Sequence, residues 1–142
     1  MILNYTTKID PDKTAAEIAK CLSLHGAKAV LTEYDEKEQV VKSLSFKIAY
    51  ASKEMSFRLP CDWKPIYDIF ERDKPIRDKT EQKLQSVRTA WRIVKDWVEA
   101  QMALVETNMV TTAQVFLPYA IVKDGHTLAE KIVSNPSFLL EG

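Results

Sequence analysis

The chain has 142 residues, of which 46% are hydrophobic and 28% charged, and its twenty basic residues match its twenty acidic ones. A chain of this length and composition can bury a core without disulfides or metal, and we expect one domain over residues 1–142. The zero net charge removes the simplest argument for a nucleic-acid protein, which usually has a basic excess, but it leaves room for a local basic patch.

Two cysteines, Cys21 and Cys61, are too few for a disulfide framework or a structural zinc site, and we expect reduced thiols. The sequence contains no run of about 18 apolar residues, and its start lacks the basic-then-apolar layout of a signal peptide. We therefore expect a cytoplasmic protein with no membrane partner, no metal and no cofactor.

The first half of the chain, residues 1–60, is expected to form a sheet with one helix. Residues 3–9 alternate larger and polar side chains with the period of a strand. Thr14 and Glu17 have the spacing of a capping box, which predicts a helix that ends near Gly26.

Three further strands are predicted over residues 27–34, 40–50 and 55–59. Their larger apolar residues share one face, and their small and charged residues share the other. The apolar set is Val40, Leu44, Phe46, Ile48, Tyr50, Met55, Phe57 and Leu59, and the polar set is Ser43, Ser45, Lys47, Ser56 and Arg58. The pattern predicts an antiparallel sheet with one face buried and the other in contact with water.

The second half, residues 61–142, is expected to be helical. Asp62 can cap a short helix over 63–70, and Thr80 can cap a long helix that runs to about residue 107. A short segment over 111–118 follows, and then a last helix that Thr127 and Glu130 would cap. The element order predicts an α+β fold, in which a four-stranded antiparallel sheet (β-α-β-β-β) precedes a helical half with one long central helix.

The long helix carries apolar residues over more than half of its circumference, whereas a surface helix needs a stripe of only about 100°. Such a helix must bury more than one side. Either it lies between the sheet and the C-terminal helices, or its second arc, with Trp97 and Leu104, packs against another subunit of a homodimer. The two explanations are compatible with each other.

The polar stripe of this helix has basic residues at three consecutive positions, Arg88, Arg92 and Lys95. Two guanidinium groups one turn apart can bind a phosphate or a carboxylate, and Arg77 could join them near the positive end of the helix dipole. The alternative is a solvated face with ion pairs one turn apart, such as Lys95–Glu99.

Catalytic motifs are absent from the sequence, which has only three glycines and therefore no glycine-rich phosphate loop. His25 suits a helix C-terminus, where an imidazolium complements the dipole. His126 is a candidate general acid or base, alone or with Cys61 as nucleophile. We expect no catalytic residues, and a small enzyme that uses His126 is a third alternative.

The segment Ala90–Gln101 (AWRIVKDWVEAQ), followed by Val115–Tyr119 (VFLPY), resembles small uncharacterised proteins of phages and integrated mobile elements. The early segments YTTKI (5–9), KT (13–14) and YD (34–35) fit the same resemblance. It spans most of the chain and implies a context only, that of a small accessory protein that acts on host machinery or defence.

These observations lead to a hypothesis about function. We expect a non-enzymatic binding module, homodimeric through Trp97 and Leu104, for an anionic ligand such as a nucleotide or a nucleic-acid phosphate. The residues expected to hold this ligand are Arg77, Arg88, Arg92 and Lys95. The alternative is a protein–protein interaction module that inhibits or adapts a host protein through exposed aromatic residues and mixed charge.

Overall fold

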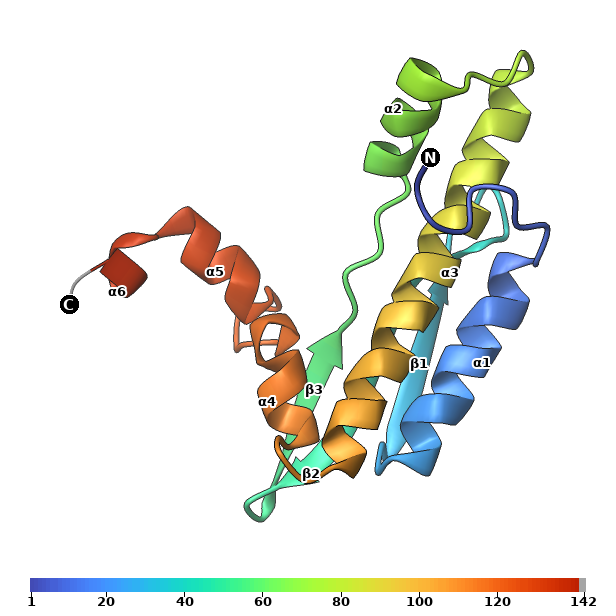
Figure 1. Ribbon diagram of the computed structural model, residues 1–142. Helices are drawn as coiled ribbons and strands as arrows, with labels where there is room; N and C mark the ends of the chain where they lie inside the picture. Colours follow the sequence, from blue (N-terminus) through green and yellow to red (C-terminus); the bar gives the residue numbers. More distant parts are fainter. Residues whose placement is uncertain (141–142) are drawn as a thin grey trace.

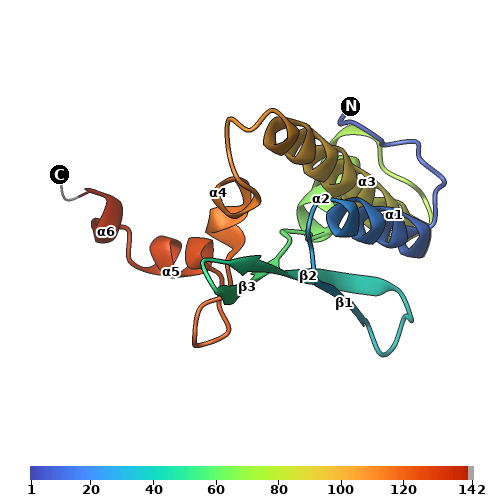
Figure 2. The same cartoon turned by 90° about the horizontal axis from the view of Figure 1, so that it is seen from below.

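The computed structural model describes residues 1–140, apart from the side chains of Phe138 and Leu140. The fold is α+β, as predicted, with an antiparallel sheet in the order β1-β2-β3. The strands are β1 (Ala29–Tyr34), β2 (Val41–Tyr50) and β3 (Lys53–Arg58). Helices α1 and α3 lie side by side on one face of this sheet (Figures 1 and 2).

The helices follow the predicted order, and the long central helix is confirmed. They are α1 (Pro11–Leu24), α2 (Lys64–Asp73), α3 (Lys79–Glu106), α4 (Thr112–Phe116), the 3-10 helix η1 (Leu117–Tyr119), α5 (Leu128–Ser134) and α6 (Ser137–Leu140). The last helices form an arm that leaves the end of α3, runs past β3 and points away from the sheet (Figure 1).

The core lies between the sheet and the two long helices. Phe46 of β2 and Phe57 of β3 stack with their ring centroids 5.1 Å apart, and Phe116 meets the Phe46 ring edge-on at 5.3 Å. Trp91 and Val98 of α3 fill the space above them and are almost fully buried. The apolar face predicted for β2 and β3 is thus the one that the helices cover.

The predicted first strand, residues 3–9, is wrong: within the described chain the sheet has three strands. Residues 3–6 form a turn, with Asn4 at φ 63°. The carbonyls of this segment accept hydrogen bonds from α3 side chains instead of from a strand, since Gln85 Nε2 donates to Tyr5 and Thr7 at 2.9 and 2.8 Å. Thr89 Oγ1 donates to the Asn4 carbonyl in the same way.

Two helix starts differ from the prediction. Helix α1 begins at Pro11, because the Asp10 side chain accepts from the Asp12 N–H and proline suits the first helical position. Thr14 is therefore buried inside the helix and does not cap it. Helix α3 is capped by Asp78, whose carboxylate accepts from two backbone N–H groups of the first turn, and not by Thr80.

The buried face of β2 also shifts at its ends. Val41 is buried in place of Val40, and Tyr50 is 51% exposed. The register between β1 and β2 is irregular at Glu33 and Tyr34, which changes the alternation next to the turn.

Candidate functional site

The predicted basic stripe on α3 lies in the structure as a set of intramolecular ion pairs. The side chains of Arg88, Arg92 and Lys95 are only 13–17% exposed. Arg88 binds Glu81 and the Gln85 side-chain oxygen, both on the same helix. These three cations are therefore packed against their own chain.

Arg92 and Lys95 connect the two long helices. Both reach Glu17 of α1, at 3.0 and 3.7 Å, and Lys95 also pairs with Glu99. Asp96, one turn after Arg92, accepts a hydrogen bond from the Asn4 side-chain amide at 2.8 Å. The stripe thus holds α1 and the N-terminal segment to α3.

Arg77 lies apart from this set, on the exposed connector before α3. Among the described residues, its side chain forms none of the ion pairs or hydrogen bonds that engage the other three. The structure does not gather the four predicted ligand-binding residues into one pocket. Anion binding by this set stays a prediction.

Trp97 and Leu104, the predicted subunit interface, lie on the side of α3 that faces the C-terminal arm. The Trp97 ring meets Phe116 and Tyr119 edge-on, at centroid distances of 5.4 and 5.5 Å. Leu104 is partly exposed. At Trp97 the second apolar arc of α3 therefore packs against α4 and η1 of the same chain. This contact corresponds to the first explanation given above, in which the helix lies between the sheet and the C-terminal helices.

The outer face of the sheet has the character of a binding surface. None of the described helices covers it, and two loops project below it, the turn between β1 and β2 and the segment between η1 and α5 (Figure 2). Between these loops lies a trough of about 540 Å³. The polar sheet face that the alternation predicted is thus its floor.

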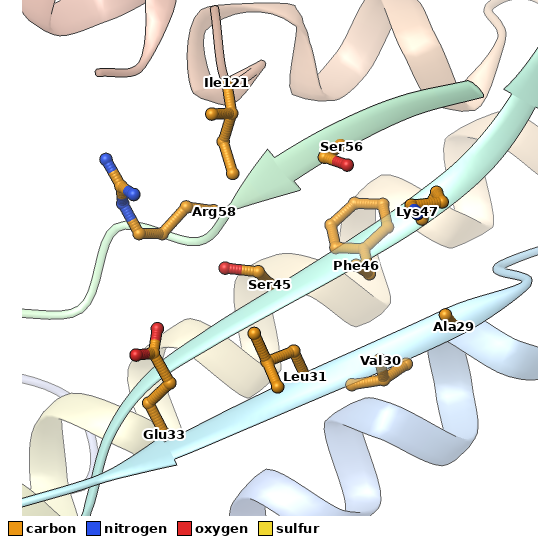
Figure 3. A pocket seen from close by; sticks show the side chains of 10 residues that line it. All are labelled: Ala29, Val30, Leu31, Glu33, Ser45, Phe46, Lys47, Ser56, Arg58 and Ile121. Atoms are coloured by element: carbon orange, nitrogen blue, oxygen red, sulfur yellow. The ribbon is translucent and has the colours of Figure 1, made fainter. Parts of the chain in front are cut away.

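Small residues form the floor of this trough and larger ones form its sides (Figure 3). Across the strands, Leu31 is paired with Ser45 and Lys47 with Ser56. Leu31, at one side, is 60% exposed, and Ile121 stands opposite on the far side of β3. The trough therefore offers an aliphatic side chain on each side, and its small floor residues would let the backbone of a bound molecule come close to the sheet.

Charges of both signs stand around the floor. Arg58 donates to Glu130 of α5 and to the Gly125 carbonyl, at 3.1 and 3.0 Å, and so fixes the loop beside β3. The pKa of Glu130 is lowered, mainly by the backbone and side chain of Thr127, which cap α5 as predicted, and then by Arg58. At the other end, Lys47 pairs with Glu54 at 3.2 Å.

A second pocket, of about 380 Å³, lies between the turn after β1, the start of α2 and α3. Lys83 Nζ stands 4.7 Å from the centre of the Trp63 ring and pairs with Glu38. Burial raises the pKa of the Cys61 thiol in this pocket to about 12. The thiol is therefore protonated at neutral pH and is not prepared for nucleophilic chemistry.

The two histidines have different surroundings. His25 caps α1, and its ring nitrogens lie 2.7 Å from the Cys21 carbonyl and 2.6 Å from Glu106 of α3. Hydrogen bonding to Glu106 is the main cause that raises the pKa of His25. His126 is exposed on the loop before α5, where its side chain bonds Asp124 and not Cys61.

Over residues 1–140, no helix has both the length and the apolar character needed to cross a membrane. Within the same described part, no group of three or more histidine, cysteine and acidic side chains has the arrangement of a metal site.

Comparison of the chain with protein-family models, with curated proteins and with solved structures gives no match. What the fold and the surface define is an α+β protein with an uncovered, mixed-charge sheet face.

Proposed function

We propose that this protein is a non-catalytic interaction module that binds a partner protein on the outer face of its sheet. The observation that carries the proposal is the trough between Leu31 and Ile121, which crosses a floor of alanine and serine. An isolated three-stranded sheet usually needs one covered face only, so this uncovered face is available for a second layer.

The chemistry of the trough favours an amphipathic helix of the partner. A helix packs well on a sheet, as α1 and α3 do on the inner face, and small floor residues allow its backbone to approach closely. Its apolar stripe would contact Leu31 and Ile121. Acidic residues beside that stripe would meet Lys47 and Arg58, and a basic residue would meet Glu33.

The anionic-ligand hypothesis has less support from the contacts. Arg88, Arg92 and Lys95 are engaged by acids of their own chain, so a ligand would have to displace Glu81, Glu17 or Glu99. Lys47 and Arg58 in the trough are also paired with acids of their own chain, but their side chains are 44% and 34% exposed, against 13–17% for the three cations of α3.

The test is affinity purification from cells of the source, with the tagged wild type and two variants. Ser45→Arg fills the floor of the trough, whereas Ala16→Arg adds the same side chain to an exposed site on α1, on the other side of the sheet. We expect a stoichiometric partner that wild type and Ala16→Arg retain and that Ser45→Arg loses. Equal recovery with Ser45→Arg contradicts the proposal.

Salt distinguishes the two classes of partner. An interface that combines apolar contacts with few charges should keep its affinity as salt rises. A steep loss of affinity with salt, with nucleic acid or a nucleotide in the eluate, would favour the anionic-ligand hypothesis instead.

A further inference from the structure

The two edges of the sheet differ in how the chain treats them. The outer edge of β3 is covered, because Ala120 pairs with Phe57 and the Ile121 N–H donates to the Ser56 carbonyl at 2.8 Å. In the described part of the chain, β1 pairs with β2 alone. The other edge of β1 therefore presents a row of backbone donors and acceptors without a strand beside them.

The sequence of β1 lacks the usual protection of an exposed edge. The strand, Ala-Val-Leu-Thr-Glu-Tyr, contains no proline and no lysine, and its only charge is Glu33. Lys28 precedes the strand. Leu31, at the middle of the strand, is 60% exposed. An unpaired edge with an exposed leucine, two β-branched residues and a single charge is a template for another strand.

We propose that a second copy of this chain pairs with β1 along this edge, antiparallel and about a two-fold axis that passes beside Leu31. A two-fold interface brings the same patch of both copies together, so the strand must be complementary to itself. The residues of β1 meet this requirement in one register.

In that register Leu31 faces Leu31 of the second copy, which buries the most exposed apolar side chain of the strand twice. Val30 faces Thr32 of the other copy on the helix-covered side, and β-branched residues make favourable cross-strand pairs. Ala29 faces Glu33 on the trough side. Residues that face each other keep the sides that they have within β1 and β2, as antiparallel pairing requires.

Charge also agrees with this register. Lys28 and Glu33 stand at opposite ends of the strand, and Lys28 points to the trough side, where it pairs with Glu54 at 3.2 Å. Antiparallel pairing about Leu31 brings Glu33 of each copy next to Lys28 and Ala29 of the other. The same opposite-charge contact then forms twice, whereas parallel pairing would align like charges.

The dimer would have a continuous six-stranded sheet, with the helices of both copies on one side and both troughs on the other. This arrangement replaces the Trp97 and Leu104 interface predicted from the sequence. The dimer contact uses the backbone edge of β1 and the partner would use the floor, and the two proposals share the side chains of Leu31 and Glu33.

The register can be tested with single cysteines. In Leu31→Cys the two introduced thiols face each other, at a Cα separation that a disulfide accepts. In Glu33→Cys they are about 13 Å apart along the strand, which is too far. We expect a disulfide-linked dimer from Leu31→Cys and from the double variant Ala29→Cys/Glu33→Cys, but not from Glu33→Cys alone, with peptide mapping to exclude Cys21 and Cys61.

The dimer itself can be tested by native mass spectrometry and sedimentation of the reduced protein over a concentration series. We expect wild type and Val133→Lys to have the dimer mass, because Val133 is exposed on α5, in the C-terminal arm on the other side of β3. Leu31→Lys places like charges opposite each other and should have the monomer mass with an unchanged far-UV circular dichroism spectrum.

A monomeric wild type overturns the proposal, and so does a Leu31→Lys variant that stays dimeric. Cross-linking of Glu33→Cys as efficient as that of Leu31→Cys overturns the register. The Ser45→Arg variant separates this proposal from the proposed function, because we expect it to lose the partner protein and to remain a dimer.

Discussion

The two faces of the sheet are built from alternate residues of the same strands, yet they differ in exposure and in polarity. Leu44, Phe46 and Phe57 on the inner face are at most 2% exposed and pack against the long helices. Leu31, Ser45 and Lys47 on the outer face remain accessible in the trough. The inner face therefore contributes most of the stability, whereas residues of the outer face can be substituted to suit a partner at little cost to stability.

The largest expected effect belongs to the inner face. Phe57→Ala removes a fully buried ring that stacks on Phe46, so we expect a loss of about 3–5 kcal/mol in the free energy of unfolding, measured by urea denaturation. Ser56→Ala, the next residue on the opposite face, is the matched control and should stay within about 0.5 kcal/mol of wild type. Similar losses in both variants would contradict the division between the faces.

The helical layer above the inner face supplies the next effect. Arg92→Glu removes the contact with Glu17 and places two acids together, so we expect a loss of about 1–3 kcal/mol in the free energy of unfolding. The charge-swapped variant Arg92→Glu/Glu17→Arg should recover part of this loss. No loss in Arg92→Glu would mean that the stripe is free, as an anion site requires.

A smaller, pH-dependent effect should come from His25, which connects the C-terminal ends of α1 and α3. Since its pKa is raised above the ordinary value of 6.5, the folded protein holds the proton more tightly than the unfolded chain. The stabilisation is complete below pH 6.5 and is lost as the pH rises through the raised pKa. Thermal melting should show this loss in wild type, weaker in Glu106→Gln and absent in His25→Ala.

The smallest effect on stability is expected on the outer face. Ser45→Arg lies in the trough, where the new side chain can extend over the floor, so the free energy of unfolding should change by less than about 0.5 kcal/mol. Urea denaturation checks this directly. A large destabilisation would show that the outer face is part of the core and would remove Ser45→Arg as a probe of binding.

The sequence predicts the local features of this fold well. Alternation identifies the three strands and the polar outer face, and the Thr127–Glu130 spacing identifies the cap of α5. Residues 3–9 alternate like a strand but do not form one. Alternation alone cannot show that their carbonyls accept hydrogen bonds from the side chain of Gln85, which lies 78 and 80 residues later in the chain. Contacts at this separation leave no local pattern.

The same limit applies to the candidate sites. The basic stripe on α3 is visible in the sequence, but its partner Glu17 is 75 residues away, on another helix. Likewise, no local pattern around Trp97 predicts that its ring packs against Phe116 and Tyr119 of the C-terminal arm. The sequence predicts only that this face of the sheet is exposed to solvent. It does not predict the trough, because Ile121 is brought there by the pairing of residues 120–121 with β3.

The most direct test of the outer face as a binding surface is photo-crosslinking in living cells of the source. A photoreactive amino acid would replace Ser45 in the trough or Ala16 on the exposed side of α1. We expect a defined adduct with one other protein from position 45 and none from position 16. Adducts from position 16 alone, or the same adducts from both positions, would contradict the account.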